Sequence, residues 1–197
     1  MIKNIFDKIL ALLGLIFCLP VFLTIAFWIK INDKGPILYK SARAGLNDKS
    51  FKMLKFRTMV RNAEKIGGPS TSDDDPRITR VGHFLRKYKL DELPQLINVL
   101  KGEMSFVGPR PEVLSEINAT PEKYTKILSV RPGITDYASL RFPNEGEILR
   151  GADDPHQAYK EKIQPEKMRL QEKYVDERSF STDCSILRQT ILTILKK

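Results

Sequence analysis

The residues best suited to chemistry lie between positions 86 and 111, where two adjacent carboxylates stand among cationic side chains. Asp91 and Glu92 are neighbours, Arg86 precedes them, and Arg110 follows in a Gly-Pro-Arg-Pro turn. A carboxylate can act as a nucleophile towards phosphorus when cations and a metal ion neutralise the phosphate oxygens. The spacing is therefore compatible with phosphoryl transfer at a carboxylate.

A simpler interpretation assigns the two carboxylates a structural role. Leu93, Leu96, Ile97 and Leu100 follow at helical spacing, and Gly102 ends the pattern. Acidic residues are favoured in the first turn of a helix because they complement its free N–H groups and its dipole. Taken alone, these residues favour capping over catalysis, and the rest of the chain must decide between the two.

The composition of the chain indicates what kind of molecule it binds. The chain has 197 residues and a formal net charge of +9, which suggests an anionic partner such as nucleic acid, anionic lipid or a phosphorylated substrate. Its two cysteines, Cys18 and Cys184, lie far apart and show no metal-binding spacing. A disulfide framework is therefore not expected, and a reducing compartment fits the sequence.

The elements that must position these residues begin with an apolar segment. Residues 9–29 carry no charged side chain and are long enough to reach across a bilayer as a helix. Pro20 lies near the middle of this run and predicts a bend, because proline removes a backbone hydrogen bond. A secretory signal peptide and a buried helix are weaker alternatives, because no cleavage site follows and the run is apolar on every side.

Positive charges on both sides of this segment bear on its path through the membrane. Basic residues flank it before and after, namely Lys3, Lys8, Lys30, Lys34, Lys40 and Arg43. A single crossing normally has them mainly on one side. We therefore predict a re-entrant membrane helix over residues 1–32 that bends at Pro20 and returns to the same leaflet, with a straight, kinked span as the alternative.

The remainder, residues 33–197, is predicted to be a cytoplasmic catalytic domain. Two short strands are expected at 37–40 and 50–59, the second with Lys55 and Arg57 on one face. Helical patterning is expected at 78–88, 112–117, 121–128 and 161–176, with loops at 70–76 and 141–155 and a Pro-Gly turn carrying Arg131 at 130–135. The predicted class is α+β, mostly helical, with a small β-hairpin.

Two amphipathic segments are expected to lie at the membrane surface around the active site. Residues 78–88 are basic on one side and apolar on the other, which is typical of a helix among lipid headgroups. A final helix follows Asp183 and ends at Lys196-Lys197, where cations suit both the helix C-terminus and an anionic leaflet. This C-terminal helix could equally complete the core or form a homodimer.

Several longer motifs, in a characteristic order, resemble one protein family. They follow the apolar segment with its central proline and read Lys-Phe-Arg-Thr-Met (55–59), Leu-Asp-Glu-Leu-Pro-Gln (90–95), Asn-Val-Leu-Lys-Gly (98–102), Met-Ser-Phe-Val-Gly-Pro-Arg-Pro (104–111) and Arg-Pro-Gly-Ile-Thr (131–135). Together they resemble the bacterial sugar transferases known as monotopic phosphoglycosyl transferases, in their small form. The resemblance runs from the N-terminus to about Thr135, with a weaker similarity at 174–187.

This resemblance implies transfer of a sugar-1-phosphate from a UDP-sugar to a polyprenol phosphate such as undecaprenyl phosphate, with release of UMP. It implies a Mg²⁺ cofactor and a monotopic anchor in the bacterial inner membrane, with the catalytic domain facing the cytoplasm. The family's nucleophilic aspartate corresponds to Asp91, and the adjoining glutamate to Glu92, both expected near the metal. Its phosphate-binding cations correspond to Lys55, Arg86 and Arg110, and we add Arg131 as a further candidate.

Two positions depart from the family pattern. Leu19 stands before Pro20 where many members have serine, which leaves the bend angle open. Asp136 and Tyr137 stand where many members have Gly-Trp. We expect the second difference to affect recognition of the sugar or uridine rather than the reaction.

Two other functions remain to be weighed against the transferase. A membrane-anchored protein that binds nucleic acid or anionic lipid would explain the charge, but not the acidic pair inside the basic region. A Mg²⁺-dependent phosphohydrolase could use the same pair. Only a transferase would need both a UDP-sugar and a polyprenol phosphate to accumulate a lipid-linked product, so nucleic acid is not expected as a partner.

Overall fold

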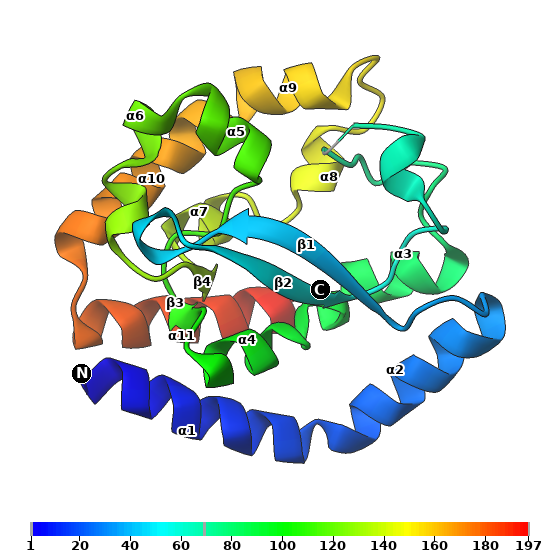
Figure 1. The fold of residues 1–197 in the computed structure, drawn as a ribbon, viewed down its shortest axis with the longest axis horizontal. Coiled ribbons are helices and arrows are strands. Elements are labelled where there is room, and N and C mark those ends of the chain that lie inside the picture. The colour runs from blue at the N-terminus through cyan, green and yellow to red at the C-terminus, as the bar shows by residue number, and fades with distance from the viewer. Residues whose placement is uncertain (1, 69, 197) are drawn as a thin grey trace.

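A computed structural model describes residues 2–68 and 70–196, and it is mostly helical with two small sheets (Figure 1). Two N-terminal helices form a bent arm along one edge of the molecule, and the other elements pack on one side of it. The predicted α+β class with a small β-hairpin is therefore confirmed.

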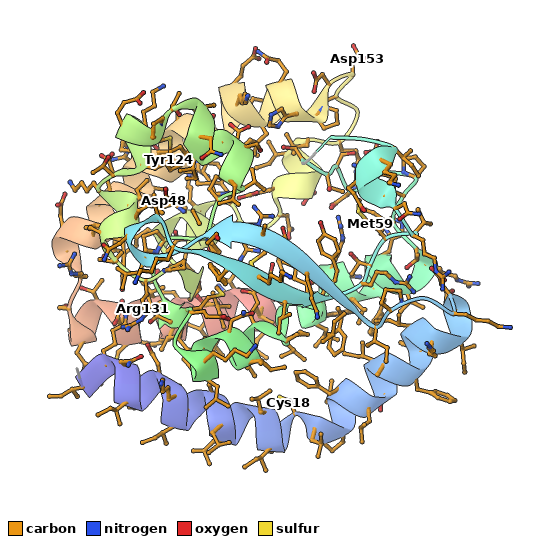
Figure 2. All side chains as sticks on the ribbon, in the orientation of Figure 1. Cys18, Asp48, Met59, Tyr124, Arg131 and Asp153 are labelled. Atoms are coloured by element: carbon orange, nitrogen blue, oxygen red, sulfur yellow. The ribbon has the colours of Figure 1, made fainter. Side chains whose placement is uncertain are left out.

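The bend separates α1 (Ile2–Phe17) from α2 (Leu19–Asn32), whose axes differ by 61°. The break lies at Cys18, and Pro20 occupies the first turn of α2, where its missing N–H costs no intrahelical bond (Figure 2). Among the described residues, only this bent pair, and no single helix, has the length and apolar composition to enter a membrane. The sequence thus predicted the bend correctly, two residues from its position.

One side of α1 is fixed to the rest of the fold. Ala11 is fully buried in a core cluster with Met53, Val99 and Met104, and Gly14 lies against Leu96 of α4. Polar contacts add to this packing, because the Ser105 hydroxyl donates to the buried carboxylate of Asp7 over 2.7 Å. The opposite side of α1 exposes large apolar side chains, among them Ile9, Leu13, Ile16 and Phe17.

The predicted hairpin is present, with shifted ends. β1 (Leu38–Ala44) pairs antiparallel with β2 (Ser50–Phe56), and Ser41 lies opposite Met53. The connection contains the short 3₁₀ turn η1 (Leu46–Asp48), where Asn47 and Asp48 have positive φ. Arg57 follows the end of β2 and forms an ion pair with Asp33 at 3.1 Å, which ties the hairpin to the end of α2.

The segment that carries the acidic pair lies between two helices. After the 3₁₀ turn η2 (Ala63–Lys65) and a loop come α3 (Arg80–Lys87), the 3₁₀ turn η3 (Leu90–Glu92) and α4 (Gln95–Lys101). Gly102 ends α4 with φ of 80°, as the sequence predicted. Gly82 of α3 is in close contact with the backbone of Thr58, where a Cβ would lie 2.0 Å from the carbonyl oxygen. Glycine there lets α3 approach the end of the hairpin.

A second sheet was not predicted. β3 (Ser105–Val107) pairs in parallel with β4 (Gly133–Thr135), so the expected Pro-Gly turn at 130–135 leads directly into a strand. Gly108 and Gly133 cross so closely that a Cβ on Gly133 would lie 2.1 Å from the Gly108 nitrogen. Pairing of segments so distant in sequence has no local signature, which explains why it was missed.

The remaining helices cover the side of the hairpin away from α1 and α2 (Figure 1). They are α5 (Leu114–Ala119), α6 (Pro121–Tyr124), the 3₁₀ turn η4 (Ile127–Ser129), α7 (Tyr137–Arg141), α8 (Glu145–Ile148), α9 (Pro155–Lys162) and α10 (Gln164–Glu177). Residues 141–155, expected to be irregular, therefore include α8 and the start of α9. Pro165 separates α9 from α10, which together correspond to the predicted helical region.

The last helix, α11 (Phe180–Leu195), begins before Asp183 rather than after it, with Ser179 as its N-cap. Asp183 is buried and accepts hydrogen bonds from Tyr174 and from Lys3 of α1. Ile186 is fully buried, whereas Ile191 and Leu195 are exposed. The first half of α11 therefore belongs to the core, and its second half leaves an apolar surface uncovered.

Candidate active site

The acidic pair does not cap a helix. Asp91 and Glu92 belong to η3. The N-cap residue of the following helix α4 is Pro94, and no side chain forms a capping hydrogen bond there. Lys89 starts the turn with φ of 58°, a left-handed conformation that turns the chain between α3 and α4. The capping interpretation is therefore wrong, and the two carboxylates are available for other contacts.

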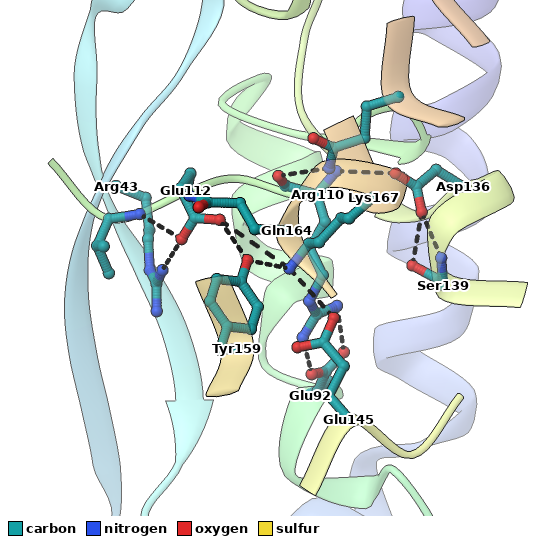
Figure 3. Close-up of polar contacts among 12 residues, drawn as sticks. Arg43, Glu92, Arg110, Glu112, Asp136, Ser139, Glu145, Tyr159, Gln164 and Lys167 are labelled. Carbon is teal, nitrogen blue, oxygen red and sulfur yellow. Dashed lines mark hydrogen bonds and ion pairs between the residues drawn. The ribbon is translucent and has the colours of Figure 1, made fainter. Parts of the chain in front are cut away.

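Glu92 is held by cations from two distant parts of the chain. Lys55 of β2 donates from Nζ to Oε1 over 2.8 Å, and Arg110 donates from Nη1 to Oε2 over 3.0 Å and from Nη2 to Oε1. The side chain of Glu92 is only 13% exposed. The fold thus brings together Lys55, Glu92 and Arg110, as the sequence predicted, and it fixes Glu92 in place. Figure 3 shows the pairing of Glu92 with Arg110.

The two neighbouring carboxylates have opposite electrostatics. Burial raises the pKa of Asp91, and the charge of Glu92 adds to this, so that Lys55 at 3.9 Å does not reverse the shift. Burial would also raise the pKa of Glu92, but Arg110 and Lys55 hold it well below its usual range. Asp91 is therefore the more basic and the less firmly bound carboxylate, which suits a nucleophile.

Arg86 approaches from α3. Its Nε donates to the Thr58 hydroxyl over 3.0 Å, and its side chain lines the same cavity as Asp91. Burial lowers the pKa of this guanidinium, with Asp91 opposing the shift. The terminal N–H groups of a half-buried arginine are suited to the non-bridging oxygens of a phosphate.

These side chains share one large cavity of about 2370 Å³. Lys55, Arg86, Asp91, Glu92 and Arg110 all line it. Its volume greatly exceeds the few hundred Å³ of a minimal ligand site, and it extends from the acidic pair to α1 and α11.

A second ion network lines the same cavity next to Arg110, whose charge Glu145 also stabilises, and sequence reasoning missed it (Figure 3). We call it the far network. Lys167 of α10 lies 3.1 Å from Glu145 and donates to the Tyr159 hydroxyl over 3.0 Å. Tyr159 in turn donates to Glu112 over 2.9 Å, and Arg43 of β1 lies 3.7 Å from the same carboxylate. Glu112 follows the Gly-Pro-Arg-Pro turn directly, which was the one available signal.

In this far network, oppositely charged side chains stabilise each other's charged forms. Burial opposes both ions, yet Glu145 and Glu112 raise the pKa of Lys167, and Lys167 helps to lower the pKa of Glu112. Burial raises the pKa of Tyr159 well above its usual value, so its hydroxyl remains a donor. The network joins β1 to α9 and α10 and gives the cavity a rigid wall.

Three residues singled out in the sequence lie outside the cavity lining. Arg131 donates from Nε to the Gly102 carbonyl over 3.0 Å and joins the turn before β4 to the end of α4 (Figure 2). Asp136 caps α7 through the Ser139 N–H and accepts a bond from the Arg110 backbone N–H. Tyr137 donates to Glu177 over 3.0 Å. Their positions do not support direct contact with a phosphate, sugar or uridine.

The carboxylates at the candidate site could supply oxygen ligands to a divalent cation. Among residues 2–68 and 70–196, no group of three or more acidic, histidine or cysteine side chains could hold a metal ion. Asp91 and Glu92 supply hard oxygen ligands, but the oxygens of Glu92 are already bound by Lys55 and Arg110. This set fits Mg²⁺ that keeps several waters and shares its coordination with substrate phosphates, and it does not form a protein cage.

A family model and several known proteins match this chain. A family model described as bacterial sugar transferase matches residues 1–197. An exopolysaccharide production protein ExoY from Sinorhizobium fredii is 42% identical over 170 residues, covering 78% of this chain and 75% of the relative.

Two longer relatives carry more specific names. An undecaprenyl-phosphate glucose phosphotransferase from Komagataeibacter xylinus is 37% identical over 77% of this chain, and a UDP-glucose:undecaprenyl-phosphate glucose-1-phosphate transferase from Escherichia coli is 40% identical over 71%. The matched regions span 30% and 31% of the length of these two relatives.

Proposed function

Because the chain belongs to the bacterial sugar transferase family, we propose that it transfers a sugar-1-phosphate from a UDP-sugar to undecaprenyl phosphate and so begins a bacterial glycoconjugate. The names of the relatives from Komagataeibacter xylinus and Escherichia coli support this reaction. The observation that carries it here is the difference between the two carboxylates, since Glu92 is bound by two cations while Asp91 has a raised pKa and lines the cavity.

In the first step, a carboxylate oxygen of Asp91 attacks the phosphorus that bears the sugar. A bond forms between this oxygen and phosphorus, and the bond from phosphorus to the bridging oxygen breaks, so that UMP leaves with the electron pair. The product is a phosphoglycosyl-aspartyl intermediate. Lys55 and Arg86 lie where they can stabilise the charge on the non-bridging oxygens.

In the second step, a phosphate oxygen of the lipid acceptor attacks the same phosphorus. The new P–O–P linkage forms as the bond to Asp91 breaks, and the carboxylate is regenerated. Glu92 keeps Arg110 and Lys55 in position throughout, because its oxygens remain their partners.

We propose Mg²⁺ as the cofactor, bound by Asp91, Glu92 and substrate oxygens. When bound, Mg²⁺ would neutralise negative charge on the diphosphate as the leaving group departs. Binding by Glu92 requires it to share an oxygen with the cations that already contact it.

We further propose that the α1–α2 pair is a re-entrant anchor in the inner membrane, with the catalytic part on the cytoplasmic side. Its support is the 61° bend together with the exposed apolar side chains of both helices. Aromatic residues gather where α2 meets α3, because Trp28 lies 5.6 Å from Phe84, which lies 5.0 Å from Tyr88. Such aromatic side chains are typical of a membrane interface.

The deciding experiment measures UMP release from a panel of UDP-sugars by the purified full chain, with and without undecaprenyl phosphate. We expect one UDP-sugar to give about one UMP per enzyme without acceptor, and a lipid-linked sugar with acceptor. Asp91→Asn should release no UMP in either case. Full activity in this variant would exclude the covalent mechanism, and release of free sugar phosphate to water would instead indicate a hydrolase.

A further inference from the structure

The cavity that contains the acidic pair extends into an apolar groove between the first and last helices. One side of the groove is formed by Leu10, Leu13, Gly14 and Phe17 of α1, and the other by Leu187, Thr190, Ile191 and Ile194 of α11. All of these residues line the same cavity as Asp91. We name this part of the cavity the α1–α11 groove.

The floor of the groove reaches the charged site directly. Ile134 of β4 lines the cavity, and its carbonyl accepts a hydrogen bond from Nη1 of Arg110 over 3.2 Å. The same Arg110 nitrogen donates to Glu92. The next residue, Thr135, is hydrogen bonded to Thr190 of α11 at 2.7 Å. The apolar groove and the phosphate-binding cations are therefore continuous.

The two walls are joined at one end of the groove. Lys3 of α1 pairs with Asp183 of α11, and the rings of Phe6 and Phe180 lie 5.8 Å apart. From this junction α1 runs towards the bend at Cys18, while α11 packs against β3 and β4 (Figure 1). Away from this junction, lining side chains of both helices are exposed, with Phe17 86% and Ile191 58% accessible.

The composition of the walls selects the kind of molecule that fits. Residues 9–17 of α1 and 189–195 of α11 contain no charged side chain. A nucleotide diphosphate would find no ionic partner there, whereas a hydrocarbon chain would bury apolar surface on both sides. The α1 wall also belongs to a helix with further exposed apolar side chains, such as Ile9 and Ile16, where a lipid would lie under the proposed function.

We propose that the α1–α11 groove binds the isoprenoid chain of the acceptor, with its first units next to the acidic pair and its phosphate towards Lys55 and Arg86. This inference rests on the proposed function and adds to it a binding site for the lipid chain. The second half of α11 thereby becomes a substrate-binding element. The charged end and the apolar groove together match an amphiphile with one phosphate.

Matched variants can separate the groove from the general apolar surface. Leu13→Gln and Ile191→Gln place an amide on the two walls of the groove. Leu12→Gln and Leu192→Gln make the same change at neighbouring exposed positions that do not line the cavity, where the side chains are 48% and 46% accessible. All four full-length proteins are compared in the same vesicles, and thermal melts check that each is folded.

We expect the groove variants to raise KM for undecaprenyl phosphate about tenfold, because loss of a buried apolar side chain contact weakens binding by that order. The two controls should stay within about twofold of the parent protein. With a short prenyl phosphate as acceptor, the difference between groove and control variants should disappear. UMP release in the absence of acceptor should be the same in all four.

A second measurement needs no variant. A polyprenyl phosphate with a photoreactive group on an isoprene unit beyond the first few should crosslink the unaltered protein at peptides from α1 and α11. The proposal is overturned if crosslinks fall elsewhere, if groove and control variants have equal KM values, or if KM for the UDP-sugar rises instead. Concentration-dependent loss of dimers in the groove variants alone would indicate a second copy of the chain as the occupant. Absence of UMP release by the parent protein would contradict the proposed function itself, whereas crosslinking would still report on the groove.

Discussion

Two buried ion networks line the same cavity and use the same types of side chain, but their charges are balanced differently. Around the acidic pair, the pKa of Asp91 is raised and those of Lys55 and Arg86 are lowered, chiefly because burial penalises their charged forms. Glu92 and Arg110 of the same group instead stabilise each other's charge, which lowers the pKa of Glu92 and raises that of Arg110. In the far network, the pKa of Glu112 is lowered and that of Lys167 is raised, because the surrounding charges and hydrogen bonds together outweigh burial, although burial lowers the pKa of Arg43 at its edge.

This difference indicates which network is built for ligands. In the far network, oppositely charged groups satisfy one another, so little is gained by binding another ion. Near Asp91, burial disfavours the charged forms of three groups, namely Asp91, Lys55 and Arg86. A bound ligand whose charges pair with these groups would offset that cost. Buried charges that their protein partners do not fully stabilise are common at functional sites, where ligand binding offsets the destabilisation. The same residue types thus serve reaction in one place and rigidity in the other.

The largest expected effect tests the reactive side of this comparison. Arg86→Gln should lower turnover by about 10²–10³-fold, because one cation that stabilises transferring phosphate charge is lost. Stability should change by less than about 1 kcal/mol, since the hydrogen bond to Thr58 is lost but a buried charge is removed as well. UMP release and thermal melting on the same preparation measure both. A large loss of stability would place Arg86 among the structural ions.

The far network should show the reverse behaviour. Lys167→Met leaves Glu112 and Glu145 without their shared cation and should lower the free energy of unfolding by about 3 kcal/mol. Turnover per folded molecule should fall less than about fivefold, because the acidic pair is not touched. Denaturant melts in detergent provide the first value, and activity normalised to folded protein the second. Adding Glu112→Gln to Lys167→Met should restore part of the stability, because one unpaired charge is removed.

The pH dependence of stability sharpens the same contrast. The folded-state pKa of Glu112 lies below its usual value of 4.5, so its contribution is present above that value and is lost as pH falls through the folded pKa. The parent protein should therefore lose more stability than Glu112→Gln when the pH is lowered from about 6 to about 3. Melting temperatures across this range provide the measurement. Parallel curves for the two proteins would contradict a charged, stabilising Glu112.

The smallest effect is expected from an exposed ion pair that serves as a baseline. Lys126 and Asp176 lie 2.7 Å apart, but their side chains are 44% and 61% accessible. Lys126→Ala should therefore change the free energy of unfolding by less than about 0.5 kcal/mol and leave activity unaltered. A change as large as that of Lys167→Met would show that burial does not distinguish the two networks.

The sequence by itself determined the bent helix pair, the hairpin and which charged groups are available at the candidate site. Pro20 in an uncharged run predicted the bent helix pair, because proline cannot continue the hydrogen bonds of a helix. Gly102 predicted the end of α4, since a left-handed residue there favours glycine. The motif around Asp91 and Arg110 indicated the site because its residue types and order are local properties of the chain.

Only the tertiary structure decided how those groups differ from one another. Neither the opposite pKa shifts of Asp91 and Glu92, nor the far network of Glu112 and Lys167, can be read from spacing, since both depend on burial and on partners distant in sequence. The parallel pairing of β3 with β4 and the groove between α1 and α11 likewise join segments far apart in the chain. Local patterns specify which groups and elements are present, whereas packing sets which charges are buried together and therefore which carboxylate is the more basic.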